Sequence, residues 1–190
     1  MRGLVVAAAG LLLLAAGCGG KKTVLKAPGA AAARPGVARV TTSEGTFAFR
    51  LDVTDSPNTV ASFEQLARDG FYNGTRFFRV VPGFVIQGGD PKNDGTGGPG
   101  YTTVDRPPAG TRYLHGTVAM AKTQTDPAGT GGSQFFVVTA ADAQLPPVYA
   151  LLGHVVSGFA AVEKINVLGN AITQRPLKRV TIERVTIAPS

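Results

Sequence analysis

The stretch that most constrains the fold covers residues 77–90. It reads as two short apolar strands joined by Pro82-Gly83, which is a typical turn sequence. Two polar side chains, Arg79 and Gln87, stand within this apolar setting. An arginine is rarely fully buried unless it is paired. The pattern therefore predicts a hairpin that either turns Arg79 to water or directs it at a ligand.

The spacing of Arg79 and Gln87 leaves their relation open. Strict alternation along one continuous strand would place both side chains on the same face, because they are an even number of residues apart. Pro82-Gly83 interrupts that strand, so the parity is only suggestive. From periodicity alone, a surface arginine with a capping glutamine is about as good an explanation as a functional pair.

Composition favours a fold of short strands. The chain has 190 residues, which suits one domain with an appendage, and its 25 glycines and 13 prolines fit many turns better than a helical bundle. Period-two apolar segments predict about eight strands, and two helical patterns accompany them. The strands are expected at 37–42, 46–53, twice within 77–90, and at 116–121, 134–139, 149–156 and 177–187, and the helices at 55–70 and 159–165.

The remaining segments are read as loops, above all 91–110 and 122–132. The glycines of 95–100 formally match a dinucleotide-binding fingerprint, but Pro99, Pro107 and Pro108 make the helix that such a site requires improbable. An antiparallel barrel is the natural way to remove the edges of the sheet. We therefore expect an all-β fold, a closed eight-stranded antiparallel barrel capped by two short helices.

The formal net charge of +7 belongs mainly to the N-terminal segment. Six of the 19 basic residues and none of the 12 acidic residues lie in the first 39 positions, which leaves 13 basic against 12 acidic residues in the rest. A nucleic-acid-binding domain would need a basic balance on its folded part, so no nucleic-acid partner is expected. Lysines in a tail suit an anionic lipid surface better.

The first residues have the layout of a bacterial export signal. Met1-Arg2 is followed by an unbroken apolar run from Leu4 to Ala16. Residues 14–18 resemble a lipobox, which ends in a cysteine that is acylated; Ala15 departs from that pattern. We expect a signal peptide at 1–17, a flexible tether at 18–36 anchored by lipid at Cys18, and a domain at 37–190. The alternative is a plain signal peptide and a secreted protein.

The residue identities in several segments are more specific than their periodicity. The stretch 77–90, with the sequence F-F-R-V-V-P-G-F-V-I-Q-G-G-D, resembles the signature of the cyclophilins, the peptidyl-prolyl cis-trans isomerases. The resemblance continues at 97–101 (G-G-P-G-Y), at Met120-Ala121 and at 132–136 (G-S-Q-F-F), and covers roughly residues 37–188 in the same order. It implies a barrel that accelerates X-Pro isomerisation in a monomer, without metal or cofactor.

The resemblance also implies roles for individual residues. Arg79 falls on the family's catalytic arginine, and Gln87 on the glutamine that holds the substrate carbonyl or steadies that arginine. Ala121 and Lys122 would line the groove by backbone contacts. The positions implied to bind substrate are Phe84, Val85, Ala121, Lys122, Gln134, Phe136, Leu145 and Tyr149.

Four departures from the family pattern concern the pocket. Val85 stands where many members have Met, which predicts a shallower pocket, and Lys122 replaces an Asn and adds a charge at the groove edge. Gln144 stands where cyclosporin-sensitive members have Trp, so weak cyclosporin binding is expected. Tyr149 replaces a frequent His but can still close the pocket with its ring and hydroxyl.

Isomerisation of an X-Pro bond fits this residue set chemically. The barrier of about 18–20 kcal/mol comes from amide resonance, so the catalyst must favour the twisted amide and needs no nucleophile or metal. A guanidinium stays charged and offers rigid N–H donors to the pyramidal prolyl nitrogen. We expect Arg79 to be that donor in a prolyl isomerase for exported proteins.

Other functions fit these residues less well. The changes at Val85, Lys122 and Gln144 leave open a binding module that holds proline-containing segments with little turnover. An envelope structural protein would not explain Arg79 beside an apolar pocket. A hydrolase is disfavoured because neither His115 nor His154 has a sequence context that marks it as a base for Ser133, although a triad is recognised by geometry. The same two histidines with Cys18 give no usual metal-ligand spacing.

Overall fold

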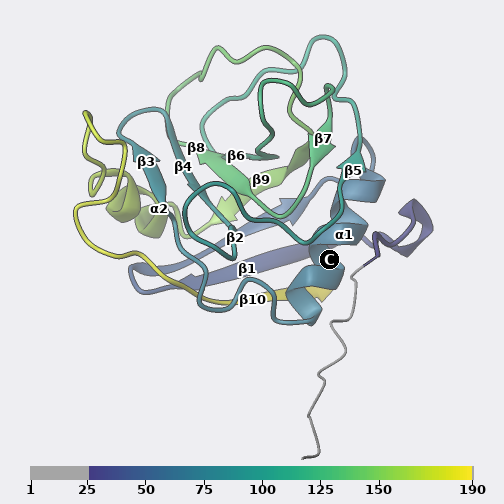
Figure 1. Cartoon of the computed structure of the whole chain (residues 1–190), viewed down its shortest axis with the longest axis horizontal. Coiled ribbons are helices and arrows are strands. Elements are labelled where there is room, and N and C mark those ends of the chain that lie inside the picture. The colour runs from purple at the N-terminus through teal and green to yellow at the C-terminus, as the bar shows by residue number, and fades with distance from the viewer. Residues whose placement is uncertain (1–25, 190) are drawn as a thin grey trace, which may run out of the picture.

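The computed structural model describes residues 26–189. Eight strands form one strongly curved antiparallel sheet, and Figure 1 shows helices α1 and α2 at opposite ends of it. The order across the sheet is β10 (Ile182–Pro189), β1 (Gly36–Thr42), β2 (Gly45–Leu51), β9 (Leu151–Ser157), β6 (Thr117–Met120), β8 (Phe135–Val138), β4 (Val85–Gly88) and β3 (Arg79–Val81).

The sheet is a half-barrel, so the expectation of a closed barrel is wrong. Strands β10 and β3 stand at its two ends, and only isolated bridges such as Arg76 with Thr181 connect the segments beside them. The edge of β3 is taken by the loop that follows α2, because the Val80 N–H donates to the Gln174 carbonyl at 2.8 Å. With three residues in β3 and that donor engaged, β10 cannot extend the ladder across the gap.

The two helices lie where the sequence predicts them. Helix α1 (Pro57–Arg68) begins with proline in its first turn and ends before Gly70, whose φ of +70° suits glycine. It buries Val60, Phe63 and Leu66 against the sheet. Helix α2 (Phe159–Asn166) buries its apolar side at the other end.

Other boundaries differ from the expectations. The segments 91–110 and 122–132 were expected to be loops, yet each contributes a two-residue strand, β5 (Thr103–Val104) and β7 (Thr130–Gly131), which pair with each other. The last strand starts at Ile182, later than expected, because residues 177–181 still belong to the loop after α2. Leu177, for instance, is 71% exposed.

Only part of the predicted tether falls among the described residues. The run of alanines there forms one short turn of helix (Ala30–Ala32), and Ala33 packs against the main core. Cys18 and the predicted signal peptide lie outside the described residues. Within residues 26–189, no helix is long and apolar enough to cross a membrane.

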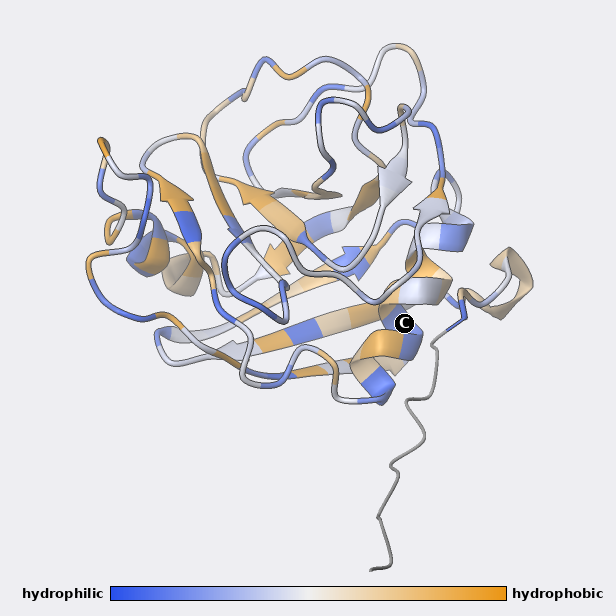
Figure 2. Cartoon of the chain, viewed as in Figure 1, coloured by the Kyte–Doolittle hydropathy of each residue, from blue (hydrophilic) through white to orange (hydrophobic). Residues whose placement is uncertain are grey.

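Apolar side chains form two separate clusters. Hydrophobic and hydrophilic residues alternate along β1 (Figure 2), so that one face of each strand fills the interior. The main cluster lies inside the curved sheet and includes Phe47, Phe63 and Phe135. The second cluster lies on the other face of β4, β6 and β8, around Phe136. The second cluster is outside the main core and is available to form a binding site.

Candidate active site

The predicted catalytic pair lies on neighbouring strands. Arg79 of β3 stands directly opposite Gln87 of β4 in the antiparallel ladder. Their neighbours Val80 and Ile86 point into the main core. The alternation of a pleated sheet therefore places both polar side chains on the outer face, and the hairpin register decides the question that the interrupted sequence pattern left open.

Two amide oxygens hold the guanidinium of Arg79. Its Nε donates to Gln174 Oε1 at 2.8 Å, and its Nη1 donates to Gln87 Oε1 at 3.4 Å. Among residues 26–189, Arg79 forms no ion pair with a carboxylate. The side chain is thus fixed in direction by neutral acceptors, and its positive charge stays available to a ligand.

The environment of Arg79 favours strong hydrogen bonding without loss of charge. The residue is half-buried, and this burial lowers the pKa of its guanidinium, while Tyr149 acts in the opposite direction. Because the ordinary pKa of arginine lies far above neutral pH, the group remains a cation there. Partial removal of water strengthens its electrostatic interaction with a bound peptide.

Gln87 is itself held by a chain of amides. Its Nε2 donates to Gln134 Oε1 at 3.1 Å, and Gln134 Nε2 donates to the carbonyls of Gly95 and Gly97 at 3.0 and 2.9 Å. The main chain of Gln134 also accepts from the Ala121 N–H at 2.9 Å. The network fixes which way each amide faces, so that Gln87 presents an oxygen to Arg79.

The loop that anchors this network is built around Asp90. This carboxylate is fully buried and accepts from the backbone N–H groups of Lys92, Asp94 and Gly95 at 2.8, 3.1 and 2.6 Å. A Cβ at position 97 would collide with Asp90 Oδ1, so glycine is required there. The last residue of the signature stretch therefore shapes the loop that orients Gln134.

The predicted pocket residues come together beside Arg79. They belong to one apolar cluster on the outer face of β4, β6 and β8, and the rings of Phe136 and Tyr149 meet edge-to-face at 5.5 Å between centroids. Val85 is buried at the base of the cluster. The predicted positions in this cluster are Phe84, Val85, Ala121, Phe136, Leu145 and Tyr149.

Tyr113 supports this cluster from behind. Its hydroxyl donates to the Tyr149 carbonyl at 2.7 Å and accepts from the Tyr149 N–H at 2.9 Å, and its ring lies 5.9 Å from the ring of Tyr149. Burial raises the pKa of Tyr113 to about 12, although the bond to Tyr149 opposes the shift. The phenol therefore stays protonated and keeps Tyr149 in place.

Lys122 and Gln144 mark the edges of the site. Lys122 Nζ donates to the carbonyls of Thr123 and Asp126 at 2.9 and 3.0 Å and lies 5.8 Å from the centre of the Tyr149 ring. The charge is thus tied to its own loop, at the border of a hollow of about 670 Å³ that Gln87 and Gln134 also line. Gln144 is exposed and has a positive φ of 51°.

The residues considered for other chemistry have structural contacts. His115 Nε2 lies 3.1 Å from Glu163 Oε1, and its ring stacks on Phe159. The buried hydroxyl of Ser133 donates to the Gly89 carbonyl at 2.8 Å. Within the described part of the chain, no three His, Cys, Asp or Glu side chains are grouped so that they could hold a metal ion.

Sequence reasoning missed three supporting residues. Asp90 closes the signature stretch and could have been noticed there as an acid after two glycines. Tyr113 could have been noticed only as a tyrosine near a predicted strand. Gln174 is 95 residues from Arg79 in the chain, and no local pattern connects the two.

Comparison with known proteins agrees with this geometry. Residues 37–187 match the family model described as cyclophilin type peptidyl-prolyl cis-trans isomerase. Peptidyl-prolyl cis-trans isomerase B of Bacillus subtilis is 47% identical over 112 residues, which cover 58% of this chain and 76% of that protein. The isomerase B of Streptomyces anulatus is 36% identical over 171 residues, covering 79% of this chain and 95% of that protein.

Solved structures extend the comparison to the fold. A crystal structure of a cyclophilin type isomerase of Cryptosporidium parvum superposes with a TM-score of 0.75 at 28% identity, covering 82% of this chain and 99% of that one. A second structure of that protein, determined in the presence of the dipeptide Ala-Pro, gives a TM-score of 0.74 at 30% identity with the same coverage. This chain belongs to the family of cyclophilin-type peptidyl-prolyl cis-trans isomerases.

Proposed function

We propose that Arg79 is the catalytic residue of this isomerase and that Gln87 and Gln174 position it. When the X-Pro amide twists, resonance is lost and the prolyl nitrogen becomes pyramidal with a free lone pair. A guanidinium N–H directed at that nitrogen stabilises the twisted amide and not the planar forms. The observation that carries this proposal is that neutral amides fix Arg79 beside an apolar pocket, where no carboxylate among residues 26–189 pairs with its charge.

The apolar cluster beside Arg79 is the proposed seat of the proline ring. Phe136 supplies a flat wall, and Leu145 and Tyr149 close the seat, while Val85 forms its floor. The backbone of Ala121 and Lys122 would bind the residues before the proline. A structure determined with Ala-Pro in a related isomerase supports a proline-containing peptide as the ligand. No step of this reaction uses a metal or a cofactor.

A test of the catalytic assignment compares three forms of the protein. Wild type, Arg79→Lys and Arg79→Ala are assayed for cis-trans exchange of an Ala-Pro peptide by NMR, without a coupled protease. Removing one preorganised charged donor should lower kcat/KM roughly 100-fold in the Ala variant. The Lys variant should fall between the two, since it keeps the charge but loses the rigid fork. Equal rates in all three forms would reject the assignment.

The same experiment distinguishes a binding module from an enzyme. A module would bind the peptide with unchanged affinity in wild type and Arg79→Ala, and neither form would accelerate exchange. Peptide titration followed by NMR shifts measures that affinity in the same samples. The departures at Val85, Lys122 and Gln144 are the reason to make this comparison. Because Gln144 stands where cyclosporin-sensitive members have Trp, we also expect weak cyclosporin binding.

We further propose that the enzyme acts outside the cytoplasm on exported proteins, as a monomer held to a membrane by lipid at Cys18. The support is the apolar run that starts at Leu4, the lipobox-like residues 14–18 and the single cysteine of the chain. Mass spectrometry of the mature N-terminus should find an acylated Cys18 as the first residue. Cleavage elsewhere without acylation would favour the secreted alternative.

A further inference from the structure

Three arginines lie on the outer face of β10, β1 and β2, at the opposite end of the strand order from β3. Arg39 of β1 is exposed between the buried Ala38 and Val40. Arg50 of β2 is exposed beside the buried Phe49 and Leu51, and Arg184 of β10 is exposed beside the buried Val185. We call Arg39, Arg50 and Arg184 the cationic stripe.

The strand register arranges the stripe as a diagonal. Arg184 stands opposite Thr41, two residues from Arg39 along β1. Arg50 stands opposite Val37, again two residues from Arg39 but in the other direction. Diagonal neighbours of this kind are roughly 7–8 Å apart. Arg39 is therefore flanked by one arginine on each neighbouring strand.

The stripe carries charge that is not neutralised locally. Among residues 26–189, none of the three arginines forms an ion pair. The acids nearest in sequence to the stripe are Glu183 and Asp52. Glu183 lies at the bulge between β10 and β1, directly before Arg184. Asp52 follows the end of β2 and accepts a hydrogen bond from the Asp55 N–H at 3.1 Å. These acids flank the two ends of the stripe, and Arg39 at its centre has no acid opposite it. Clustered cations at this spacing repel one another, so an anionic partner would stabilise them.

The other outward-facing residues of β1 and β2 have short side chains. They are Val37, Thr41, Thr46 and Ala48. These short side chains leave the three arginines as the most prominent groups of the face, which is bordered by hollows at Arg50 and at Arg184. A row of exposed cations on short neighbours suits an extended anionic surface.

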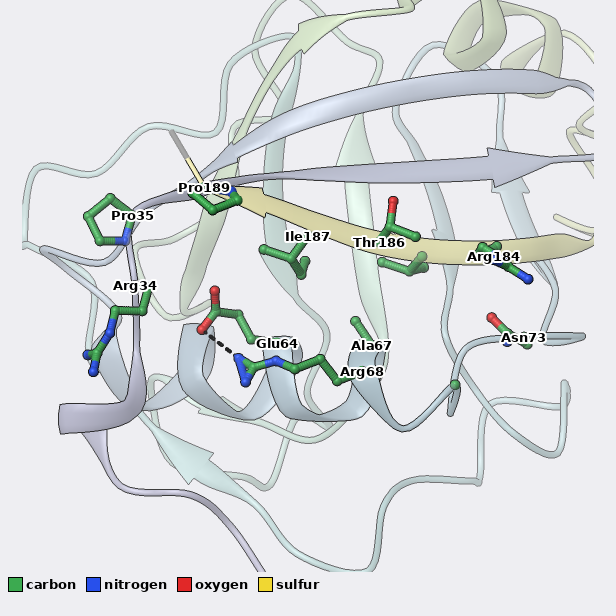
Figure 3. A pocket seen from close by; sticks show the side chains of 12 residues that line it. Arg34, Pro35, Glu64, Ala67, Arg68, Asn73, Arg184, Thr186, Ile187 and Pro189 are labelled. Carbon is green, nitrogen blue, oxygen red and sulfur yellow. Dashed lines mark hydrogen bonds and ion pairs between the residues drawn. The ribbon is translucent and has the colours of Figure 1, made fainter.

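The free edge of β10 continues the positive character. A hollow of about 770 Å³ lies between α1 and β10. Figure 3 shows Arg34 at one end of it and Arg184 at the other. Within the hollow, Glu64 is paired with Arg68 at 3.2 Å. Arg34 Nη1 donates only to the carbonyls of Ala31 and Ala33 among the described residues, so its charge adds to that of the stripe.

The described part of the N-terminal segment joins the domain beside the stripe. Residues 26–35 hold Lys26 and Arg34 and no acid, and β1 begins at Gly36, opposite Pro189 on β10. In Figure 1, β1 and β10 form the lower side of the molecule, whereas β3, β4 and β8, which carry the active site, lie toward the upper side.

We propose that the cationic stripe contacts the surface of an anionic lipid bilayer. Each arginine near such a surface contributes to binding through the negative surface potential. Contact through this face would turn the outer face of β3, β4 and β8 away from the lipid, so that the active site stays open to peptide. The proposal stands on the stripe and is independent of the catalytic role of Arg79.

The test measures vesicle binding of the full chain, carrying Cys18→Ser so that acyl chains do not contribute. The stripe variant is Arg39→Gln, Arg50→Gln, Arg184→Gln. The control variant, Lys92→Gln, Arg106→Gln, Arg175→Gln, removes the same charge from exposed loops elsewhere. Co-sedimentation is measured in 0.1 M salt with vesicles of phosphatidylcholine alone or mixed with phosphatidylglycerol.

The stripe variant should bind the anionic vesicles roughly 100-fold more weakly than the parent, because each basic residue near the surface contributes about 1 kcal/mol. Binding to neutral vesicles should not change, and the control variant should lose less than tenfold. Equal losses in the two variants would mean that net charge alone matters and would overturn the proposal, as would no loss in the stripe variant.

Two further measurements keep the result unambiguous. The stripe variant should retain the parent's melting temperature and exchange rate, because its substitutions are exposed and do not contact the active site. If it does not fold, Arg39→Gln alone should still weaken binding roughly fivefold. Tight binding of the parent to a single-stranded oligonucleotide, lost in the stripe variant to the same extent as vesicle binding, would reject a lipid surface in favour of nucleic acid.

Discussion

Gln174 offers the sharpest test of how the active site is held. Its side chain accepts the only bond shorter than 3 Å that Arg79 makes among the described residues, and it comes from the loop between α2 and β10. The loop is well braced, since the Gln174 N–H donates to the Asn170 carbonyl at 2.8 Å and the Val80 N–H donates to the Gln174 carbonyl at 2.8 Å. Replacing Gln174 with Ala removes the side-chain acceptor and keeps both backbone bonds.

The magnitude follows from the exposure of this bond. A hydrogen bond to a charged group contributes about 1.5–3 kcal/mol when it is protected, but Gln174 is exposed and water competes for Arg79. We therefore take about 1 kcal/mol, which corresponds to a roughly fivefold loss in kcat/KM. Stability should change by less than about 0.5 kcal/mol. Gln174 has a positive φ of 55°, which costs Ala about as much backbone strain as Gln. The substitution therefore does not change the strain at this position.

The assay is peptide exchange by NMR over a range of substrate concentrations. A positioning role predicts that kcat falls while KM stays within twofold, because Gln174 does not contact the proline pocket. Ile172→Ala is the matched control, since Ile172 is 93% exposed in the same loop. A Gln174→Ala enzyme with wild-type kcat, alongside an inactive Arg79→Ala enzyme, would show that Arg79 does not need this contact.

Three further substitutions test other parts of the site. Tyr113→Phe removes both bonds to the Tyr149 backbone and should lower the free energy of unfolding by about 1–3 kcal/mol. The folded-state pKa of Tyr113 is raised to about 12, so its contribution to stability is fully present below the ordinary pKa near 10 and declines as pH rises through 12. The free energy of unfolding, measured by urea titration, should therefore change less between pH 8 and pH 11 in the variant than in wild type. Asp90→Asn should lower the free energy of unfolding by at least about 2 kcal/mol and abolish activity, because one carboxylate oxygen is replaced by an NH₂ donor that faces backbone N–H groups. An unchanged melting curve would contradict this role of Asp90. Lys122→Ala should lower kcat/KM about threefold for peptides with Glu beside the proline and leave neutral peptides unchanged, an effect that 1 M salt should abolish.

Much of the fold was predictable because its information is local. Period-two alternation and the turn at Pro82-Gly83 predict the hairpin, and proline and glycine mark both ends of α1. The prediction of a cyclophilin-type isomerase is confirmed, since the family is specified by short segments such as 77–90. The prediction of a closed barrel was wrong. Closure depends on whether β3 and β10 pair with each other, and the neighbour of an edge strand cannot be inferred from that strand's own sequence.

The sequence by itself determined the family, the identity of the candidate donor Arg79 and the residue types of the pocket, because each of these is written in contiguous or regularly spaced residues. The tertiary structure decided which partners fix those residues. Arg79 faces Gln87 only through the hairpin register, and it meets Gln174 only because a loop 95 residues away packs on the edge of β3. The cationic stripe likewise exists only once three strands are aligned, since its arginines belong to segments that no local pattern connects. Contacts between distant segments depend on the packing of the whole chain, and short-range periodicity does not carry that information.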